Sequence, residues 1–164
     1  MGEVSPHQAP AGDADASGFD GLFARERGPM LRLAVLMVGS AESAEDVVQD
    51  AFASVSVRWE ELERPGGYLR TTVVNGCRMV LRRREVEDRH EGALSGPAVS
   101  ALPTHLVELR EALTGLSERQ RIAIVMRYFA DASDVEIAEL LDCRQSTVRS
   151  LIRRGLSSMR KELA

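Results

Sequence analysis

Apolar residues recur along this chain at the spacing of helices, and no segment shows the sustained alternation of a strand. The clearest helical face lies within 44–55 and consists of Ala44, Val47, Val48, Ala51, Phe52 and Val55. A second face lies within 68–84 and consists of Leu69, Val73, Cys77, Val80 and Leu81. The pattern predicts an all-α fold with aliphatic helix packing.

Local signals predict where the other helices begin and end. A helix should start near Phe19, and Gly28-Pro29 should interrupt it before a second apolar run over 30–38. Shorter helices should follow at 106–113 and up to Tyr128, and the last should run over 145–163. Three pairs resemble capping boxes at helix starts, namely Ser43 with Asp46, Ser117 with Gln120, and Ser133 with Glu136.

A polar stretch divides these helices into two blocks. Residues 1–17 are rich in Ala, Gly, Asp and Pro and should be a disordered tail. Residues 85–105 contain glycine and proline without a sustained apolar period, so they should form a flexible linker. We therefore predict two small helical domains, at 18–84 and 106–164.

The net charge of −4 conceals two basic segments. Residues 70–84 contain five arginines and no acidic residue, and residues 144–161 contain six basic residues and no acidic one. Contact with phosphate depends on such local patches rather than on net charge. An acidic chain with two basic segments is therefore still expected to bind DNA.

Other features exclude several classes of protein. No apolar run is long enough to cross a membrane, and residues 1–17 lack the parts of a secretory signal, which predicts a cytoplasmic protein without membrane insertion. Cys77 and Cys143 lie in apolar helical patterns, as buried structural thiols do. The three histidines lack metal-ligand spacing, and we predict no metal, cofactor or catalytic site.

The segment 134–153 has the pattern of a helix-turn-helix, with two short amphipathic helices and arginines only on the second. In such a motif the second helix enters the major groove, its first residues reach base edges, and later arginines hold phosphates. We predict DNA contacts from Arg144, Gln145, Ser146, Thr147, Arg149, Ser150, Arg153 and Arg154, the last two to the backbone.

Two further polar faces each allow two interpretations. Opposite the apolar face of 44–55 lie Glu45, Asp46, Gln49 and Asp50, and spacing alone favours a merely solvated surface there. The polar face of 68–84 consists of Arg70, Asn75, Arg78, Arg82, Arg83 and Arg84. That face could be solvated, or it could contact DNA, because Asn can read adenine and Arg can read guanine or phosphate.

Four motifs in this order resemble the sigma-70 family of RNA polymerase sigma factors. They are AEDVVQDAF at 44–52, the segment 65–84 with YLR and VVN, LSERQR at 116–121 with RYF at 127–129, and the helix-turn-helix. Only the second and fourth regions of that family have counterparts, over roughly 19–84 and 106–162. The chain therefore resembles the extracytoplasmic-function (ECF) sigma factors.

The resemblance implies a protein that is not an enzyme and that turns core RNA polymerase into a promoter-specific holoenzyme. It assigns docking on the β′ clamp helices to Glu45, Asp46, Val48, Gln49 and Asp50. It assigns recognition of the promoter −10 element to Arg70, Asn75, Arg78, Arg82 and Arg83. The helix-turn-helix would read the −35 element while its domain sits on the β flap, and an anti-sigma factor is a further expected partner.

The chain departs from the family pattern at four places. Val80-Leu81 occupies positions where many relatives have aromatic residues, and Asp142 stands where they usually have the turn glycine. Arg144 stands where a serine usually caps the second helix, and Gln145-Ser146 replaces a common Val-Gly pair. Two other functions stay open from the residues alone. One is a stand-alone helix-turn-helix regulator that binds DNA as a dimer, and the other is a helical adaptor that binds only proteins.

Overall fold

The computed structural model describes residues 18–91 and 103–164, and all regular structure in these two ranges is helical. The first range contains α1 (Phe19–Val38), α2 (Ala41–Val57), the short 3-10 helix η1 (Trp59–Glu61) and α3 (Pro65–Glu91). The second contains α4 (Thr104–Thr114), α5 (Glu118–Phe129), α6 (Asp134–Leu141) and α7 (Gln145–Leu163). The predicted all-α fold is confirmed.

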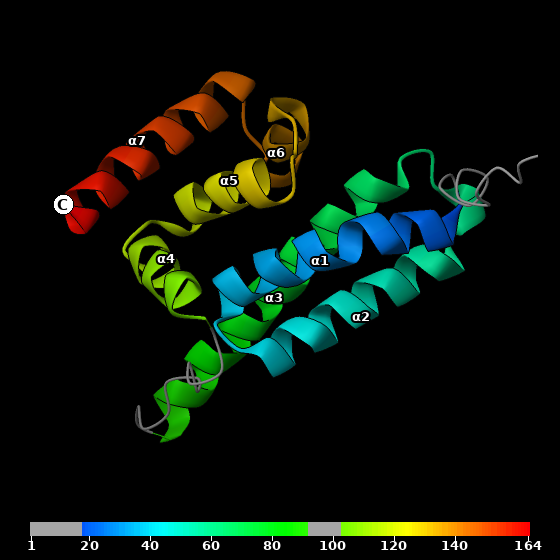
Figure 1. The fold of residues 1–164 in the computed structure, drawn as a ribbon, viewed down its shortest axis with the longest axis horizontal. Helices are drawn as coiled ribbons and strands as arrows, with labels where there is room; N and C mark the ends of the chain where they lie inside the picture. The colour runs from blue at the N-terminus through cyan, green and yellow to red at the C-terminus, as the bar shows by residue number, and fades with distance from the viewer. Residues whose placement is uncertain (1–17, 92–102) are drawn as a thin grey trace, which may run out of the picture.

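The helices form two groups that lie against each other (Figure 1). We call α1, α2 and α3 the N-terminal bundle, and α4, α5, α6 and α7 the C-terminal bundle. Helix α1 packs on α2 and α3 within its own bundle and also contacts α4 and α5. Buried apolar residues of both bundles join in one core. None of the described helices is both long enough and apolar enough to cross a lipid bilayer.

The predicted interruption at Gly28-Pro29 is wrong, because α1 continues through both residues. Proline inside a helix removes one backbone hydrogen bond and costs roughly 3 kcal/mol. Leu22 before the proline and Met30 and Leu33 after it are all buried in the core. Burial of apolar side chains on both sides of Pro29 therefore outweighs the local signal for a break.

The start of α2 also differs from the prediction. Ser40, not Ser43, caps this helix, and its Oγ accepts a hydrogen bond from the backbone N–H of Ser43 at 3.3 Å. Gly39 ends α1 in the left-handed conformation, with φ of 71°. This left-handed φ favours glycine at the corner between α1 and α2, where the guanidinium of Arg110 of α4 also packs against residue 39.

Helix α3 is longer at both ends than the predicted helix over 68–84. It begins at Pro65, a residue whose fixed φ suits a first helical turn, and continues to Glu91 through the first part of the predicted linker. Residues 85–91 carry no apolar period because they leave the core, but Glu85 and Arg89 have the spacing of a helix-stabilising pair. Residues 92–102 of the predicted linker lie outside the described residues, and the prediction is also wrong at its end, because α4 already begins at Thr104.

The C-terminal bundle follows its sequence signals closely. Ser117 with Gln120 and Ser133 with Glu136 form complete capping boxes, so both predictions are confirmed.

The two cysteines differ in their burial. Cys77 of α3 is fully buried, and this burial raises the pKa of its thiol to about 12. The prediction of a buried thiol within a helix therefore holds for Cys77 but is wrong for Cys143, which lies in the turn between α6 and α7 and is only half-buried.

Candidate nucleic-acid interface

The helix-turn-helix consists of α6, a tight turn and α7. Ser133 Oγ accepts a hydrogen bond from the Glu136 N–H at 3.2 Å, and Glu136 Oε2 accepts one from the Ser133 N–H at 2.9 Å. Asp142 forms the turn in the left-handed conformation, with φ of 46°. The N–H of Cys143 then bonds to the carbonyl of Ala138 at 3.0 Å. These local bonds fix the direction in which α7 leaves the turn.

The apolar side of α7 packs against the rest of the C-terminal bundle. Val148, Gly155 and Met159 are buried on this side. A Cβ at position 155 would lie 2.6 Å from Cδ1 of Ile124, so the glycine permits a close approach of α7 to α5. Because this side is fixed, the opposite side of α7 faces outward.

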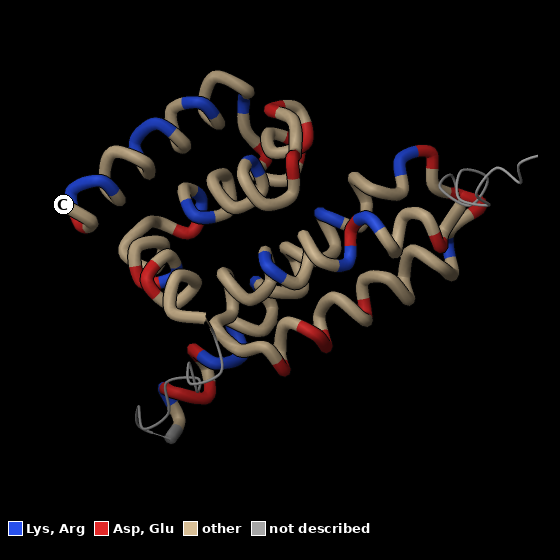
Figure 2. Tube along the Cα trace, viewed as in Figure 1, with Lys and Arg blue, Asp and Glu red and all other residues tan. Residues whose placement is uncertain are grey.

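The outward side of α7 carries the predicted DNA-contact residues. Six of them are exposed, namely Arg144, Gln145, Ser146, Arg149, Arg153 and Arg154, and Thr147 and Ser150 are half-buried. Figure 2 shows basic residues spaced along the length of α7. Arg144 occupies the N-cap position but makes no side-chain cap hydrogen bond. The structure therefore places these residues together on one accessible, basic element.

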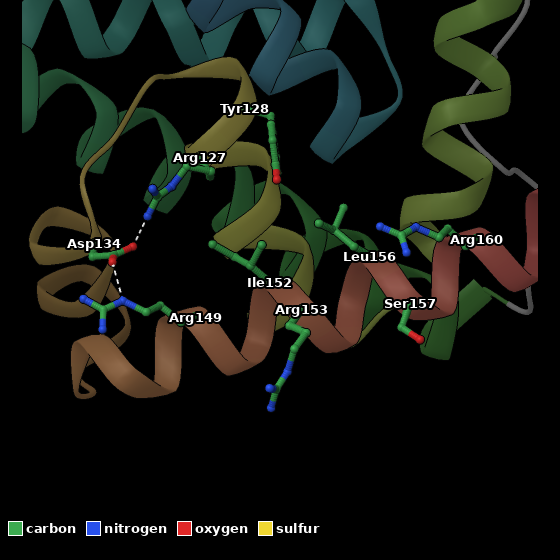
Figure 3. A pocket seen from close by; sticks show the side chains of 9 residues that line it. All are labelled: Arg127, Tyr128, Asp134, Arg149, Ile152, Arg153, Leu156, Ser157 and Arg160. Atoms are coloured by element: carbon green, nitrogen blue, oxygen red, sulfur yellow. Dashed lines mark hydrogen bonds and ion pairs between the residues drawn. The ribbon is translucent and has the colours of Figure 1, made fainter.

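Asp134 joins three helices beside this face (Figure 3). One of its carboxylate oxygens pairs with Arg127 of α5, and the other accepts a hydrogen bond from Nε of Arg149 at 2.9 Å. A groove of about 680 Å³ adjoins the triad. Its lining consists of Arg127, Tyr128, Asp134, Arg149, Ile152, Arg153, Leu156, Ser157 and Arg160. Sequence analysis predicted neither the triad nor the groove. The three- and four-residue spacing of the lining residues along α7 was the signal that could have identified the groove.

A second groove, of about 890 Å³, lies between α2 and α3. Asp46, Gln49 and Asp50 line it from α2, and Asn75 and Arg83 line it from α3. The structure thus brings together residues predicted for polymerase docking and residues predicted for −10 contact. Both groups are exposed.

The remaining residues predicted for polymerase docking differ in their exposure. Glu45 is exposed on α2, whereas Val48 is only 3% exposed and belongs to the core. A partner that approaches α2 meets the carboxylates and the amide rather than Val48. Val48 instead holds α2 in place from below.

The remaining basic residues of α3 point in different directions. Arg70 pairs with Glu136 of α6, and Nε of Arg78 donates to Glu118 of α5 at 2.9 Å. Arg84 donates to the carbonyl of Val38 and, at 3.0 Å, to Oγ of Ser43, which fixes the corner between α1 and α2. Arg82 is exposed. The α3 residues predicted for −10 contact are therefore divided among the groove, the solvent and the C-terminal bundle.

Sequence analysis missed several groove residues of α3. Tyr68, Thr72 and Met79 line the groove on the same side as Asn75 and Arg83. Their spacing of three and four residues was the signal that could have identified them. Hydrogen bonds with Ser54 and Arg58 lower the pKa of Tyr68, and Oγ of Ser54 lies 2.9 Å from its phenolic oxygen.

The contacts of Glu136 with Ser133 and Arg70 change the pKa of its carboxyl group. Burial by itself would raise the pKa of Glu136, but hydrogen bonds from Ser133 and Arg70 outweigh it and lower that pKa. Glu136 is therefore ionised near neutral pH and holds the positive charge of Arg70. No three His, Cys, Asp or Glu residues in 18–91 and 103–164 are grouped so that they could hold a metal ion.

Comparison with known proteins identifies the family of both bundles. Residues 22–86 match the family Sigma-70 region 2, and residues 106–159 match Sigma-70, region 4. The RNA polymerase sigma-E factor of Streptomyces coelicolor is 31% identical over 140 residues, with 82% of this chain and 79% of that protein covered. The ECF RNA polymerase sigma factor SigM of Mycobacterium tuberculosis is 30% identical over 160 residues, with 91% and 79% covered.

A solved structure shares the fold. The sigma factor RpoE of Bartonella quintana, crystallised with the anti-sigma factor NepR, superposes with a TM-score of 0.77 at 22% sequence identity. The match covers 88% of this chain and 96% of that chain. Together, the two matched regions and the similar curated proteins show that this chain belongs to the sigma-70 family of RNA polymerase sigma factors, in its extracytoplasmic-function group.

Proposed function

We propose that this chain binds core RNA polymerase and directs it to promoters with a −10 and a −35 element. The observation that carries the proposal is the combination of two exposed surfaces in a member of this family. One is the acid-and-amide side of α2 beside the α2–α3 groove, and the other is the basic side of α7. A stand-alone regulator would use only the second surface.

The α2 surface is the proposed docking site for the β′ clamp helices. Glu45, Asp46, Gln49 and Asp50 supply three carboxylates and one amide on an exposed helix face. Figure 2 shows acidic residues along α2, the helix of the N-terminal bundle that lies farthest from the C-terminal bundle. Such a surface complements a basic partner and leaves the apolar side of α2 in the core.

The α3 side of the groove is the proposed −10 surface. Asn75 and Arg83 are accessible there, and Arg82 is exposed nearby, so all three can contact DNA in the present arrangement. Arg70 and Arg78 can contribute only after they leave Glu136 and Glu118. We assign region 2 to the N-terminal bundle, predicted at 18–84, and region 4 to the C-terminal bundle, predicted at 106–164, although α3 continues to Glu91 and α4 begins at Thr104.

The α7 face is the proposed −35 surface, and the C-terminal bundle is the part expected to sit on the β flap. An anti-sigma factor is a further proposed partner, in keeping with the described complex of the Bartonella quintana protein with NepR. The chain would act in the cytoplasm with the polymerase. It would contribute promoter recognition, and the polymerase would supply the catalysis.

Run-off transcription with sequencing of the transcripts tests this function. Core RNA polymerase would transcribe fragmented genomic DNA with and without the chain. New start sites that share two spaced upstream elements are expected only when the chain is present. A protein that binds a palindromic site without polymerase and yields no new start would contradict the proposal.

The Asp46→Arg substitution tests the docking surface. Charge reversal on the exposed side of α2 should reduce polymerase binding at least tenfold, because a basic partner surface would meet a like charge. Asp20→Arg is the matched control, since it reverses an exposed carboxylate on α1, outside the α2 surface, the α2–α3 groove and the C-terminal bundle. Co-purification with core polymerase measures the effect. Equal holoenzyme yields for both variants would refute the docking assignment.

A further inference from the structure

The contacts of Asp134 point to a role in promoter reading that the family match does not assign. We propose that Asp134 is a positioning residue that holds the guanidinium of Arg149 in orientation for reading a base of the −35 element. The inference rests on the proposed function. It deepens that function because it identifies which carboxylate sets the geometry of a predicted base-reading side chain.

The first support is the atom of Arg149 that Asp134 engages. The hydrogen bond of 2.9 Å comes from Nε, so the two terminal nitrogens stay available as a pair of donors. A guanine presents O6 and N7 to such a pair in the major groove. In Figure 3 the terminal nitrogens of Arg149 extend beyond Asp134, away from Arg127. The hydrogen bond therefore holds the guanidinium of Arg149 at Nε and leaves its two terminal nitrogens unoccupied by Asp134.

The second support is that Asp134 is itself fixed from the opposite side. Its other carboxylate oxygen pairs with Arg127 of α5, and its side chain is only 21% exposed. It also lies in the first turn of α6, where the helix dipole favours a negative charge. A carboxylate held in this way is a rigid support, whereas Arg149 has a side chain that is 68% exposed.

The benefit of this support is preorganisation. A long, exposed arginine samples many rotamers, and ordering it on DNA costs free energy that reduces the gain from a base contact. Asp134 restricts those rotamers before DNA binds. Loss of Asp134 should therefore weaken discrimination at the base that Arg149 reads, while contacts elsewhere on α7 keep their strength.

A merely structural role for Asp134 makes a different prediction. The carboxylate bridges α5, α6 and α7, so its removal could loosen the whole bundle. Loosening would reduce transcription at all −35 sequences alike. A positioning role would instead change the relative use of bases at the position read by Arg149. Base preference separates the two roles where overall activity does not.

The experiment is run-off transcription by holoenzyme on a promoter library randomised across the −35 element. The proteins are wild type, Asp134→Asn, Asp134→Ala, Arg149→Ala and the Asp134→Ala/Arg149→Ala double variant. Arg149→Ala should reduce the preference at its base by about tenfold. Each Asp134 variant should lose a several-fold part of that same preference, and the double variant should match Arg149→Ala.

Two controls accompany the library. Glu108→Ala removes an exposed carboxylate from α4 of the same bundle, away from the predicted DNA contacts, and should leave every base preference unchanged. Thermal unfolding and polymerase co-purification report folding, and Asp134→Asn retains the size of the side chain if Asp134→Ala unfolds. An equal loss at all positions, or a further loss of preference in the double variant, would overturn the inference. Absence of specific starts with wild type would instead refute the proposed function, and the inference with it.

Discussion

Asp142 stands at the sharpest point of the helix-turn-helix, and its backbone is left-handed. This conformation costs most residues about 1–2 kcal/mol, but aspartate accepts it better than most because its short polar side chain can bond locally. Aspartate can therefore form the left-handed turn for which relatives usually have glycine.

The Asp142→Ala substitution should lower the free energy of unfolding by about 1 kcal/mol, because alanine keeps the Cβ strain and loses the polar group. Asp142→Gly is the matched comparison and should cause no loss, since glycine adopts this conformation without strain. Urea denaturation measures both. Equal stabilities for the alanine and glycine variants would show that the left-handed turn is not what selects the residue here.

At the scale of single residues, sequence analysis identified the contacts between residues that lie close together along the chain. The capping boxes at Ser117 and Ser133 join atoms three residues apart, so the letters alone identify them. The partners of Arg70 and Arg78 lie 66 and 40 residues away along the chain, on another bundle. No local pattern records such a pairing, because it depends on how the two bundles pack.

Among the helices, α7 has a buried apolar side but no side-chain cap at its N-terminus. Its N-cap residue, Arg144, makes no side-chain hydrogen bond to the first turn. The Arg144→Ser substitution should raise the free energy of unfolding by about 1 kcal/mol, because serine Oγ can accept a bond from a free N–H of that turn. Urea or thermal unfolding measures the gain.

Arg144→Ala is the control for this prediction. It removes the same guanidinium without supplying an acceptor, so it should not reproduce the stabilisation. If alanine stabilises the protein as much as serine does, relief of positive charge near the start of α7 is the cause rather than capping.

The elements also show where sequence analysis was incomplete. Helix α1 passes through Pro29 because core packing on both sides outweighs a local break signal. Helix α3 continues to Glu91 because solvated helix needs no apolar period. Periodicity reports burial, so it located the buried parts of helices well and their exposed ends poorly.

At the scale of the whole molecule, two ion pairs connect the bundles, Arg70–Glu136 and Arg78–Glu118. Replacing both glutamates with glutamine should weaken this contact by up to about 2 kcal/mol, since partly exposed pairs contribute about 0–1 kcal/mol each. Glutamine keeps the capping box of α6, so the helix itself should be unaffected. Small-angle X-ray scattering should show a larger radius of gyration, most clearly at high ionic strength.

The control for this experiment is the Glu111→Gln/Glu139→Gln variant, which neutralises exposed carboxylates on α4 and α6 outside either pair. Acidification gives an independent check. The pKa of Glu136 is lowered from 4.5, so its contribution is fully present above that value and is lost as the pH falls through its folded pKa. Unchanged dimensions in both tests would show that the apolar contact of α1 with α4 and α5 suffices.

The pairing of Arg70 and Arg78 with the molecule's own carboxylates also has a consequence for population. A ligand that needs these arginines free binds only those molecules in which the bundles have parted, and its apparent affinity falls by that fraction. The coupling is reciprocal, so such a ligand also favours parting of the bundles. A partner that binds both bundles at once would instead favour the arrangement in which they stay together. Such a partner would weaken DNA binding without covering any base-reading residue.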